Sequence, residues 1–498
     1  MIDMKKDLNQ CITDLVSITL KKGILFDEKD KIYAINNLLY LLGESIYEPC
    51  EPNENADYFT VMNHLLDNAG AKGLIDNDDI AERDRFEAKI IDQFLPAPST
   101  VDRRFKKKYK IGPMTATNWL YQLSKATNYI KTNRIAKNIT FVYEGKYAPL
   151  DLTINLSKPE KDPKKIAVTR DVSDDYPKCP LCVENVGFYG NHRIQPRSNH
   201  RVVTLSLNHE KEAWGLQYSP YAYFNEHCIV LKKDHVPMKV DNETFATLIE
   251  FINKFPHYLI GSNAGLPIVG GSILSHYHFQ GGRYDFPIEQ ARVIRRYKRH
   301  RVEIEVLDWP LSTIRIVGNN ENKILDMVEQ IAAQWQTYEN KELGIIAKTD
   351  EQHNAVTPIV KLKGNRYQFY IVLRNNRVTK ERPYGLFHPR KEYFHIKKEN
   401  IGLIEVMGLA VLPGRLAKEL TLIERCIKDN KDYGSYPELK KHVPWIETFE
   451  EEVKQTADVS TFLKQEVGNV FEKVLEDCGV FKQDDTEAFL RFTEDAMY

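Results

Sequence analysis

The stretch that most constrains the fold is residues 270–282, which read GGSILSHYHFQGG near the middle of the chain. In an extended strand alternate side chains share one face, so His276, His278 and Gln280 point together while the two aromatic residues between them face a core. Same-face neighbours lie about 7 Å apart, which suits convergence on one small anion or metal. The glycine pairs at both ends indicate close approach of a ligand to the backbone. The alternative is a half-buried strand whose histidines are only hydrogen-bonded.

The chain has 498 residues with 69 basic and 70 acidic side chains, which give a formal net charge of -1. Such a balance provides no attraction to nucleic acid or to an anionic membrane. No run of about 18 apolar residues occurs, so no membrane span is expected. The N-terminus also lacks the apolar segment of a signal peptide. Seven cysteines spread over a long chain do not form a disulfide framework, so we expect a reducing, cytoplasmic location.

The hydrophobic periodicity predicts an α+β protein. Helical spacing dominates residues 1–135, where we expect a scaffold or an interface. A period of two then predicts a hairpin of residues 139–143 and 150–156. The remaining pattern predicts strands at 201–207, 221–232, 302–307 and 313–317, a hairpin of 359–362 with 367–373, and helices at 242–255, 322–338, 401–426, 449–454, 459–475 and 485–492. The order strand, helix, strands occurs twice in this part of the chain.

A Cys-x-x-Cys motif at Cys179 and Cys182 is either half of a zinc site or a redox pair. Redox motifs of the thioredoxin kind follow a βαβ pattern, which is not evident here, so zinc is favoured. Two cysteines supply half of a tetrahedral shell, and two more ligands must come from elsewhere. Just before the motif, Lys158 and Lys161 lie in a proline-marked basic loop. This loop either covers phosphates or is a plain surface connection.

These motifs resemble those of the galactose-1-phosphate uridylyltransferases, members of the histidine-triad superfamily in which glutamine replaces the third histidine. The family motif is His-Pro-His-Gly-Gln, against His-Tyr-His-Phe-Gln at residues 276–280. The chain is most similar to the second, Gram-positive type, which has a long helical N-terminal region and a segment like residues 396–413. The resemblance covers most of the chain.

For the fold, the resemblance implies two histidine-triad-like halves with mostly antiparallel sheet flanked by helices, plus an N-terminal helical region. We place the helical region at 1–135 and the first half, with the zinc and nucleophile motifs, at 136–290. The second half and a helical tail occupy 291–498.

For the chemistry, the resemblance implies ping-pong transfer of UMP from UDP-glucose to galactose-1-phosphate, a reaction of galactose metabolism in the Leloir pathway. His278 would be the nucleophile that attacks the α-phosphorus. The residue type agrees, because a neutral imidazole is a competent nucleophile near pH 7, with an ordinary pKa of about 6.5. Gln280 would hydrogen-bond the phosphoryl oxygens, and its amide has no titratable group with which to activate water.

The resemblance also implies a structural zinc site of Cys179, Cys182, His235 and His276, and no organic cofactor. Four protein ligands leave no open position for a substrate. His227 is a rival to His235 as the remaining ligand. If the site has decayed in this type, the two cysteines would be ordinary buried thiols.

For the nucleotide, the resemblance places Asn263 near the phosphates, with Gly271 and Ser272 in the glycine-rich lead-in to the histidines. Residues 217–219, which end in Ser219, occupy the place where the family holds the ribose, although they lack its Asn-Asp pair. Lys158 and Lys161 would take the role of the family's basic residues. A partner subunit contributes to the hexose pocket in the family, which predicts a homodimer.

Two other functions fit the same motifs. One is a histidine-triad nucleotide hydrolase or a dinucleoside polyphosphate phosphorylase, and the other is a non-enzymatic, zinc-stabilised nucleotide-binding protein. Assays with UDP-glucose plus galactose-1-phosphate, against dinucleoside polyphosphates, distinguish the first from a transferase. Formation of a covalent adduct with UDP-glucose distinguishes the second.

Overall fold

The computed structural model describes residues 2–157, 176–191, 194–208, 212–270 and 273–498. The chain ahead of the first strand is helical, as its apolar periodicity predicts. Aspartate side chains cap two of these helices, with Asp57 and Asp79 accepting from backbone amides of the first turn. The helices are α1 (Ile2–Lys21), α2 (Lys31–Leu41), α3 (Tyr58–Ala71), α4 (Ile80–Asp92), α5 (Pro98–Tyr109), α6 (Pro113–Ala126) and α7 (Thr132–Ile135).

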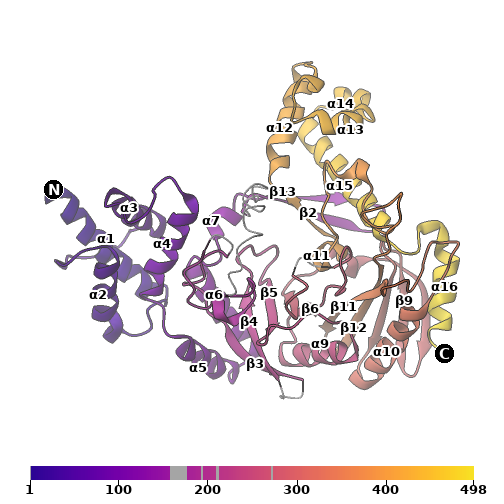
Figure 1. Cartoon of the computed structure of the whole chain (residues 1–498), viewed down its shortest axis with the longest axis horizontal. Coiled ribbons are helices and arrows are strands. Elements are labelled where there is room, and N and C mark those ends of the chain that lie inside the picture. Colours follow the sequence, from indigo (N-terminus) through magenta and orange to yellow (C-terminus); the bar gives the residue numbers. More distant parts are fainter. Residues whose placement is uncertain (1, 158–175, 192–193, 209–211, 271–272) are drawn as a thin grey trace.

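A ten-stranded sheet forms the centre of the molecule, and all its neighbouring strands are antiparallel. The N-terminal helices gather beyond the β3 end of this sheet (Figure 1). In sheet order the strands are β3 (Val203–Leu207), β4 (Glu212–Tyr218), β5 (Cys228–Lys232), β7 (His278–Gly282), β6 (Leu259–Gly261), β11 (Asn354–Lys363), β12 (Arg366–Asn375), β10 (Thr313–Gly318), β9 (Val302–Leu307) and β8 (Val293–Arg299).

The sheet consists of two halves with the same topology. The first runs β3-β4-β5, helix α9 (Asn242–Lys254), β6 and β7; the second runs β8-β9-β10, helix α10 (Glu321–Thr337), β11 and β12. In both, the last strand inserts between the third and the fourth, and the halves meet where β6 pairs with β11. This repeat confirms the prediction of two similar, mostly antiparallel halves flanked by helices.

Helices α9 and α10 cover one face of the sheet (Figure 1). Apolar side chains fill this interface, and the two aromatic residues of the central stretch lie in it as the period of two predicts. Tyr277 and Phe279 are buried, and Phe279 stacks on Trp214 with a centroid distance of 5.0 Å. The opposite face therefore carries the polar residues of the same strand.

A three-stranded sheet and a short helix pack over part of that opposite face. The predicted hairpin forms β1 (Ile139–Glu144) and β2 (Pro149–Asn155), and β13 (Leu409–Pro413) joins β2 in parallel. Helix α11 (Leu403–Val406) precedes β13. This layer belongs to the apolar core that includes Leu259, Ile359 and Val372 of the main sheet.

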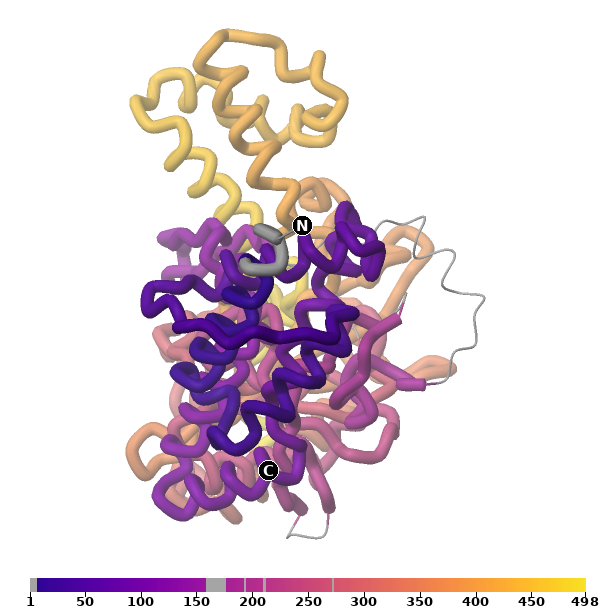
Figure 2. Tube along the Cα trace, turned by 90° about the vertical axis from the view of Figure 1, so that its left-hand side faces the viewer, coloured from indigo at the N-terminus to yellow at the C-terminus, as the bar shows by residue number. Residues whose placement is uncertain are grey.

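The helices that follow β13 form an arm, defined as residues 415–470, that stands away from the sheet in both views (Figures 1 and 2). Helix α15 leads back to the main body, where α16 ends the chain. None of the helices in the described residues combines the length and the apolar content of a membrane span. The C-terminal helices are α12 (Arg415–Lys428), α13 (Val443–Glu447), α14 (Glu450–Gln455), α15 (Val459–Cys478) and α16 (Thr486–Asp495).

Two element predictions were wrong in part. The strand expected at 221–232 begins only at Cys228, because a turn with left-handed residues Ala222 and Glu226 (φ 37° and 55°) occupies its first half. The helix expected at 401–426 is interrupted by β13, whose apolar run pairs with β2 and follows Gly408 at φ 97°. Strands β4, β6 and β8 were not predicted.

Candidate functional site

Four cysteine and histidine side chains, of the kinds that can bind a metal ion, meet above the main sheet. The Sγ atoms of Cys179 and Cys182 lie 3.5 Å apart. The Nδ1 atom of His276 lies 3.2 Å and 3.6 Å from these two sulfurs, and the Nδ1 atom of His235 lies 3.1 Å from the sulfur of Cys182. All four ligand atoms are within 4.8 Å of one another. The structure therefore brings together the four residues that the sequence pointed to, from three separate parts of the chain.

The separations of 3.1–3.6 Å between these ligand atoms are close to those around a tetrahedral ion. Zinc bonds of about 2.3 Å to sulfur and about 2.0 Å to nitrogen hold ligand atoms about 3.3–3.8 Å apart. The Nε2–H group of His276 donates to the carbonyl oxygen of Lys232 over 2.8 Å, which leaves the Nδ1 lone pair facing the sulfurs. His227, the rival ligand, lies outside the cluster and contacts Gln280 instead.

The next histidine presents the other ring nitrogen. The Nδ1–H group of His278 donates to the backbone carbonyl of His276 over 2.7 Å, so its Nε2 atom carries the free lone pair. Burial lowers the pKa of His278 to about 4, and the ring is only 5% exposed. A neutral imidazole with a fixed proton and a free Nε2 lone pair is arranged as a nucleophile.

Gln280 is half-buried beside His278 on the same strand, as the alternation predicts. Its Oε1 atom lies 3.2 Å from the Nε2 atom of His227, which directly precedes β5. The backbone carbonyl of His227 accepts a 2.8 Å hydrogen bond from the backbone amide of Ser219. The sequence indicated Gln280 and Ser219 for the site, but gave no signal that His227 connects them.

Three glycines of the central stretch, Gly270, Gly281 and Gly282, are explained by the protein's own packing. A Cβ atom on Gly281 would collide with the carbonyl oxygen of Leu259 in the neighbouring strand, and one on Gly282 would lie 2.6 Å from the carbonyl oxygen of Glu226. A Cβ atom on Gly270 would lie 2.8 Å from the carbonyl oxygen of Leu266. At these three positions the close neighbour is another segment of this chain, and no ligand is needed to account for the glycine.

Asn263 is almost fully buried two residues beyond β6, whose Gly261 lies opposite Gln280. Its Oδ1 atom accepts a 2.9 Å hydrogen bond from the amide of Leu403, which links the loop after β6 to helix α11. This bond joins the loop after β6 to the segment 396–413 that resembled the family. Of the other predicted substrate residues, Lys158, Lys161, Gly271 and Ser272 lie outside the described residues.

A second His–Gln pair, which the sequence did not indicate, joins His200, which precedes β3, to Gln217 on β4, beside the predicted site. The Nε2 atom of His200 lies 2.7 Å from Oε1 of Gln217, and the buried ring stacks on Tyr129. Gln217 lies opposite Ile229, and Ile229 opposite Gln280, so both glutamines project from the same face of the sheet. Residues 200 and 217 come together only because β3 pairs with β4, and no local sequence motif predicts that pairing.

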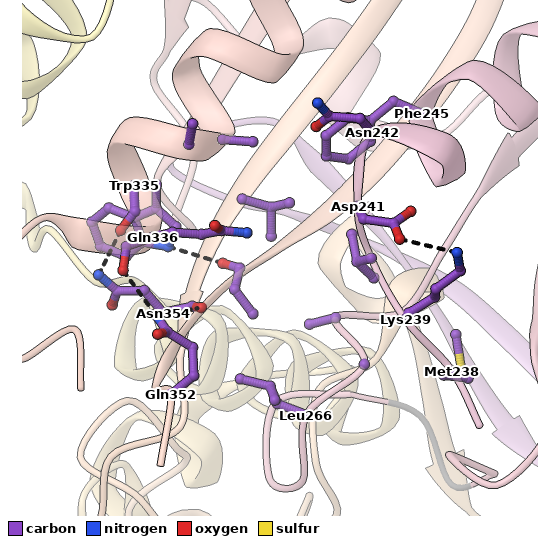
Figure 3. A pocket seen from close by; sticks show the side chains of 17 residues that line it. Met238, Lys239, Asp241, Asn242, Phe245, Leu266, Trp335, Gln336, Gln352 and Asn354 are labelled. Carbon is purple, nitrogen blue, oxygen red and sulfur yellow. Dashed lines mark hydrogen bonds and ion pairs between the residues drawn. The ribbon is translucent and has the colours of Figure 1, made fainter. Parts of the chain in front are cut away.

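A cavity of about 240 Å³ lies beside the segment that follows Asn263 (Figure 3). Ala264 and Leu266 from this segment line it, together with residues from the start of α9 and the end of α10. In Figure 3, Lys239 and Asp241 pair with each other at its edge. None of the predicted site residues that the structure describes lines this cavity, so the chemistry of β7 lies elsewhere.

Two family models match the sequence. The model described as "Galactose-1-phosphate uridyl transferase, N-terminal domain" matches residues 24–237, and the one described as "Galactose-1-phosphate uridyl transferase, C-terminal domain" matches residues 250–428. Together these matches cover most of the chain.

Curated relatives match over nearly the full length. A galactose-1-phosphate uridylyltransferase of Clostridium perfringens (strain 13 / Type A) is 45% identical over 497 residues, which cover 98% of this chain and 99% of the relative. The enzyme of the same name from Bacillus subtilis (strain 168) is 44% identical and covers 93% of each chain.

Among solved structures, yeast Ap4A phosphorylase Apa2 in complex with Ap4A is similar with a TM-score of 0.37 and 11% identity. The match covers 72% of this chain and 97% of that chain.

Proposed function

Because this chain belongs to the galactose-1-phosphate uridylyltransferase family, we propose that it transfers UMP from UDP-glucose to galactose-1-phosphate through a covalent intermediate on His278. The observation that carries the proposal is the orientation of the His278 ring. Its Nδ1–H is held by the carbonyl of His276, so the Nε2 lone pair is free to attack. The two-step route divides one difficult transfer into two easier ones.

In the first step, Nε2 of His278 forms a bond to the α-phosphorus of UDP-glucose. The bond from that phosphorus to the bridging oxygen breaks, and glucose-1-phosphate leaves with the electron pair. The ring becomes cationic as the N–P bond forms, and the bond from Nδ1–H to the His276 carbonyl then gains strength. In the second step, a phosphate oxygen of galactose-1-phosphate attacks the same phosphorus, the N–P bond breaks, and neutral His278 is restored.

Gln280 supports the transfer over hydrolysis. Its side-chain amide donates to phosphoryl oxygens without being able to remove a proton from water. The leaving sugar phosphate is a stable anion, so little proton donation is required. We place Asn263 and Ser219, with Gly271, Ser272, Lys158 and Lys161, around the nucleotide and its phosphates on the basis of the family resemblance.

The Cys179, Cys182, His235 and His276 cluster would hold a structural zinc ion. Such an ion supplies no open coordination position and instead fixes the protein around it. The same residue, His276, contributes its ring to the cluster and its carbonyl to His278. We therefore expect the cluster to orient the nucleophile through one residue. A cytoplasmic homodimer remains part of the proposal.

Isotope exchange tests the two-step route. With UDP-glucose and labelled glucose-1-phosphate alone, a covalent intermediate predicts that label enters UDP-glucose without any galactose-1-phosphate present. An enzyme that transfers UMP directly between two bound sugar phosphates predicts no exchange. Release of free UMP in place of UDP-galactose in the complete assay would favour the hydrolase alternative.

A further inference from the structure

We propose that His227 is a positioning residue that holds the Gln280 amide with its NH2 group directed at the transferred phosphoryl group. The inference rests on the proposed function, because it concerns how Gln280 performs the role given to it there. Its starting point is the contact of 3.2 Å between Nε2 of His227 and Oε1 of Gln280. This contact joins the residue before β5 to the middle of β7.

The strand register places the two side chains on one face. Ile229 lies opposite Gln280 and Cys228 lies opposite Gly281, so His227 comes opposite Gly282. His227 and Ile229 are two positions apart and project to the same side as Gln280. Because Gly282 has no side chain, no side chain at position 282 lies between the imidazole of His227 and the amide of Gln280.

The unpartnered Nδ1 atom of His227 indicates which of the two side chains, His227 or Gln280, donates the hydrogen bond between them. His227 is 2% exposed, and its Nδ1 atom has no partner among the described residues. If the Gln280 amide donated to Nε2, the ring proton would lie on Nδ1 as a buried donor without an acceptor. If Nε2–H donates to Oε1, the unpartnered Nδ1 is only an acceptor, which is the less costly arrangement because orphaned buried donors are rarer.

This tautomer leaves the other end of the amide available. No acceptor for the Gln280 Nε2 group occurs within the residues that the structure describes. A glutamine whose oxygen is held can offer both amide protons to phosphoryl oxygens without first rotating. Burial lowers the pKa of His227 to about 4, so the ring stays neutral near pH 7 and keeps one donor and one acceptor.

The imidazole is itself held in place by its surroundings. The ring of Phe224 lies 4.6 Å from it and the ring of Tyr223 lies 5.5 Å from it, between centroids. The preceding residue, Glu226, is buried in the left-handed region and accepts a 2.6 Å hydrogen bond from the hydroxyl of Tyr258. These contacts fix the turn that delivers His227 to Gln280, as expected of a support for a reacting group.

The test uses variants that separate the donor from the ring. In His227→Gln the amide nitrogen lies at the same number of bonds from the backbone as Nε2 of histidine, so it can restore the donor. The matched control is His227→Asn, whose amide nitrogen reaches only the Nδ1 position. His227→Phe keeps a planar ring without a donor. We expect His227→Phe and His227→Asn to slow single-turnover uridylylation by about 10–100-fold, as for other supporting partners, and His227→Gln to recover most of the rate.

A double-mutant cycle with Gln280→Ala shows whether His227 acts through Gln280. Thermal unfolding of each variant reports the folded state. We expect His227→Phe to slow the Gln280→Ala enzyme by less than about 2-fold, because the residue that it positions is already gone. Equal slowing in both backgrounds, or equal rates for the glutamine and asparagine variants, would overturn the inference. A wild-type rate for Gln280→Ala alone would instead remove the role proposed for Gln280, and with it the inference.

Discussion

The imidazole of His278 has one nitrogen bonded to a protein carbonyl and the other left free, whereas His276 uses its two nitrogens in the opposite sense. His276 keeps its proton on Nε2 and turns Nδ1 to the sulfurs. Two histidines of the same stretch thus receive different tautomers from their backbone partners, Lys232 and His276. The difference matches a metal ligand in one case and a nucleophile in the other.

The site could be predicted only where its residues lie in recognisable motifs. The Cys-x-x-Cys and His-x-His-x-Gln patterns supply five side chains, and the family resemblance adds His235. The structure brings these six side chains into two groups. His227 was considered only as a rival zinc ligand, and His200 was missed. Each of them becomes significant through a partner on another strand, Gln280 and Gln217 respectively. Close approach of a ligand is not needed to explain Gly281, since the segment that approaches it is β6 of the same sheet.

Gly281→Ala is expected to destabilise the protein strongly. The added Cβ would collide with the backbone oxygen of Leu259, which cannot move without breaking the β6–β7 pairing. Overpacking of this kind costs about 1–3 kcal/mol, and more where backbone is the obstacle. Gly112→Ala is the control, because its new Cβ would meet only Thr115 Oγ1 at 3.6 Å and its φ of 172° is ordinary extended backbone.

Denaturant unfolding of both glycine variants measures the difference. A lower midpoint for Gly281→Ala, with Gly112→Ala close to the wild type, is the expected result. Equal midpoints would contradict the explanation of Gly281 by strand packing.

At the scale of elements, a cluster of ionisable side chains lies where helix α12 begins the arm. Nδ1 of His395 lies 2.9 Å from Nδ1 of His442, and Nε2 of His442 lies 3.0 Å from Glu419. Arg415 and Lys441 also donate to Glu419. Burial, followed by the charges of His442, Arg415 and Lys441, lowers the pKa of His395 to about 3. Burial opposes the shift at Glu419, yet hydrogen bonds from His442 and Lys441 bring its pKa to about 2.

This cluster predicts that the arm loosens in mild acid. His395, which contacts the arm through His442, is neutral in the folded protein and protonated in the unfolded chain below its ordinary pKa of about 6.5. Its contribution to stability is therefore present above that pH and is lost as the pH falls toward 3. At pH 5 this group alone raises the opening constant by roughly 30-fold. Glu419 adds a loss between about pH 4.3 and 2.

Hydrogen exchange of α12, α13 and α14, corrected for the intrinsic effect of pH, measures this opening relative to α9. The fall in protection between pH 7 and 5 should be smaller in His395→Phe, which keeps a ring and cannot take up a proton. The same fall in the variant and the wild type would exclude His395 as its source.

Most regular elements were predictable because hydrophobic period reports local structure. Strand β9 matches its predicted bounds, and α9, α10 and α15 differ only at their ends. Strand β6 is too short, at three residues, to show a period, and β8 is an edge strand whose exposed positions are basic except Ile294. The sequence of β13 was interpreted as part of a helix. Its strand conformation depends on pairing with β2, which lies more than 200 residues away in the chain.

At the scale of the whole molecule, the cysteine–histidine cluster ties together three distant parts of the chain. Cys179 and Cys182 come before β3, His235 follows β5, and His276 precedes β7. The family resemblance and the tetrahedral spacing both favour zinc there. We therefore predict one zinc ion per chain, and a loss of stability and of uridylylation together when it is removed.

Cys179→Ser tests this link, with Cys50→Ser, a change at an exposed cysteine, as the control. The first variant should contain less zinc and unfold at least roughly 5 °C lower, while the control should match the wild type. Metal analysis and thermal unfolding provide the readouts. A full zinc content in Cys179→Ser would exclude this residue as a ligand.

The most direct test of the account is the mass of the intact protein after incubation with UDP-glucose alone, followed by mapping of the modified peptide. We predict a gain of one uridylyl group per chain on His278, with release of glucose-1-phosphate. His278→Ala should show no gain while remaining folded, and His64→Ala, a change at an exposed histidine of α3, should be modified as the wild type is. Two results would contradict the account. One is a wild-type protein that stays unmodified here yet produces UDP-galactose when galactose-1-phosphate is added, and the other is a uridylyl group on any residue other than His278.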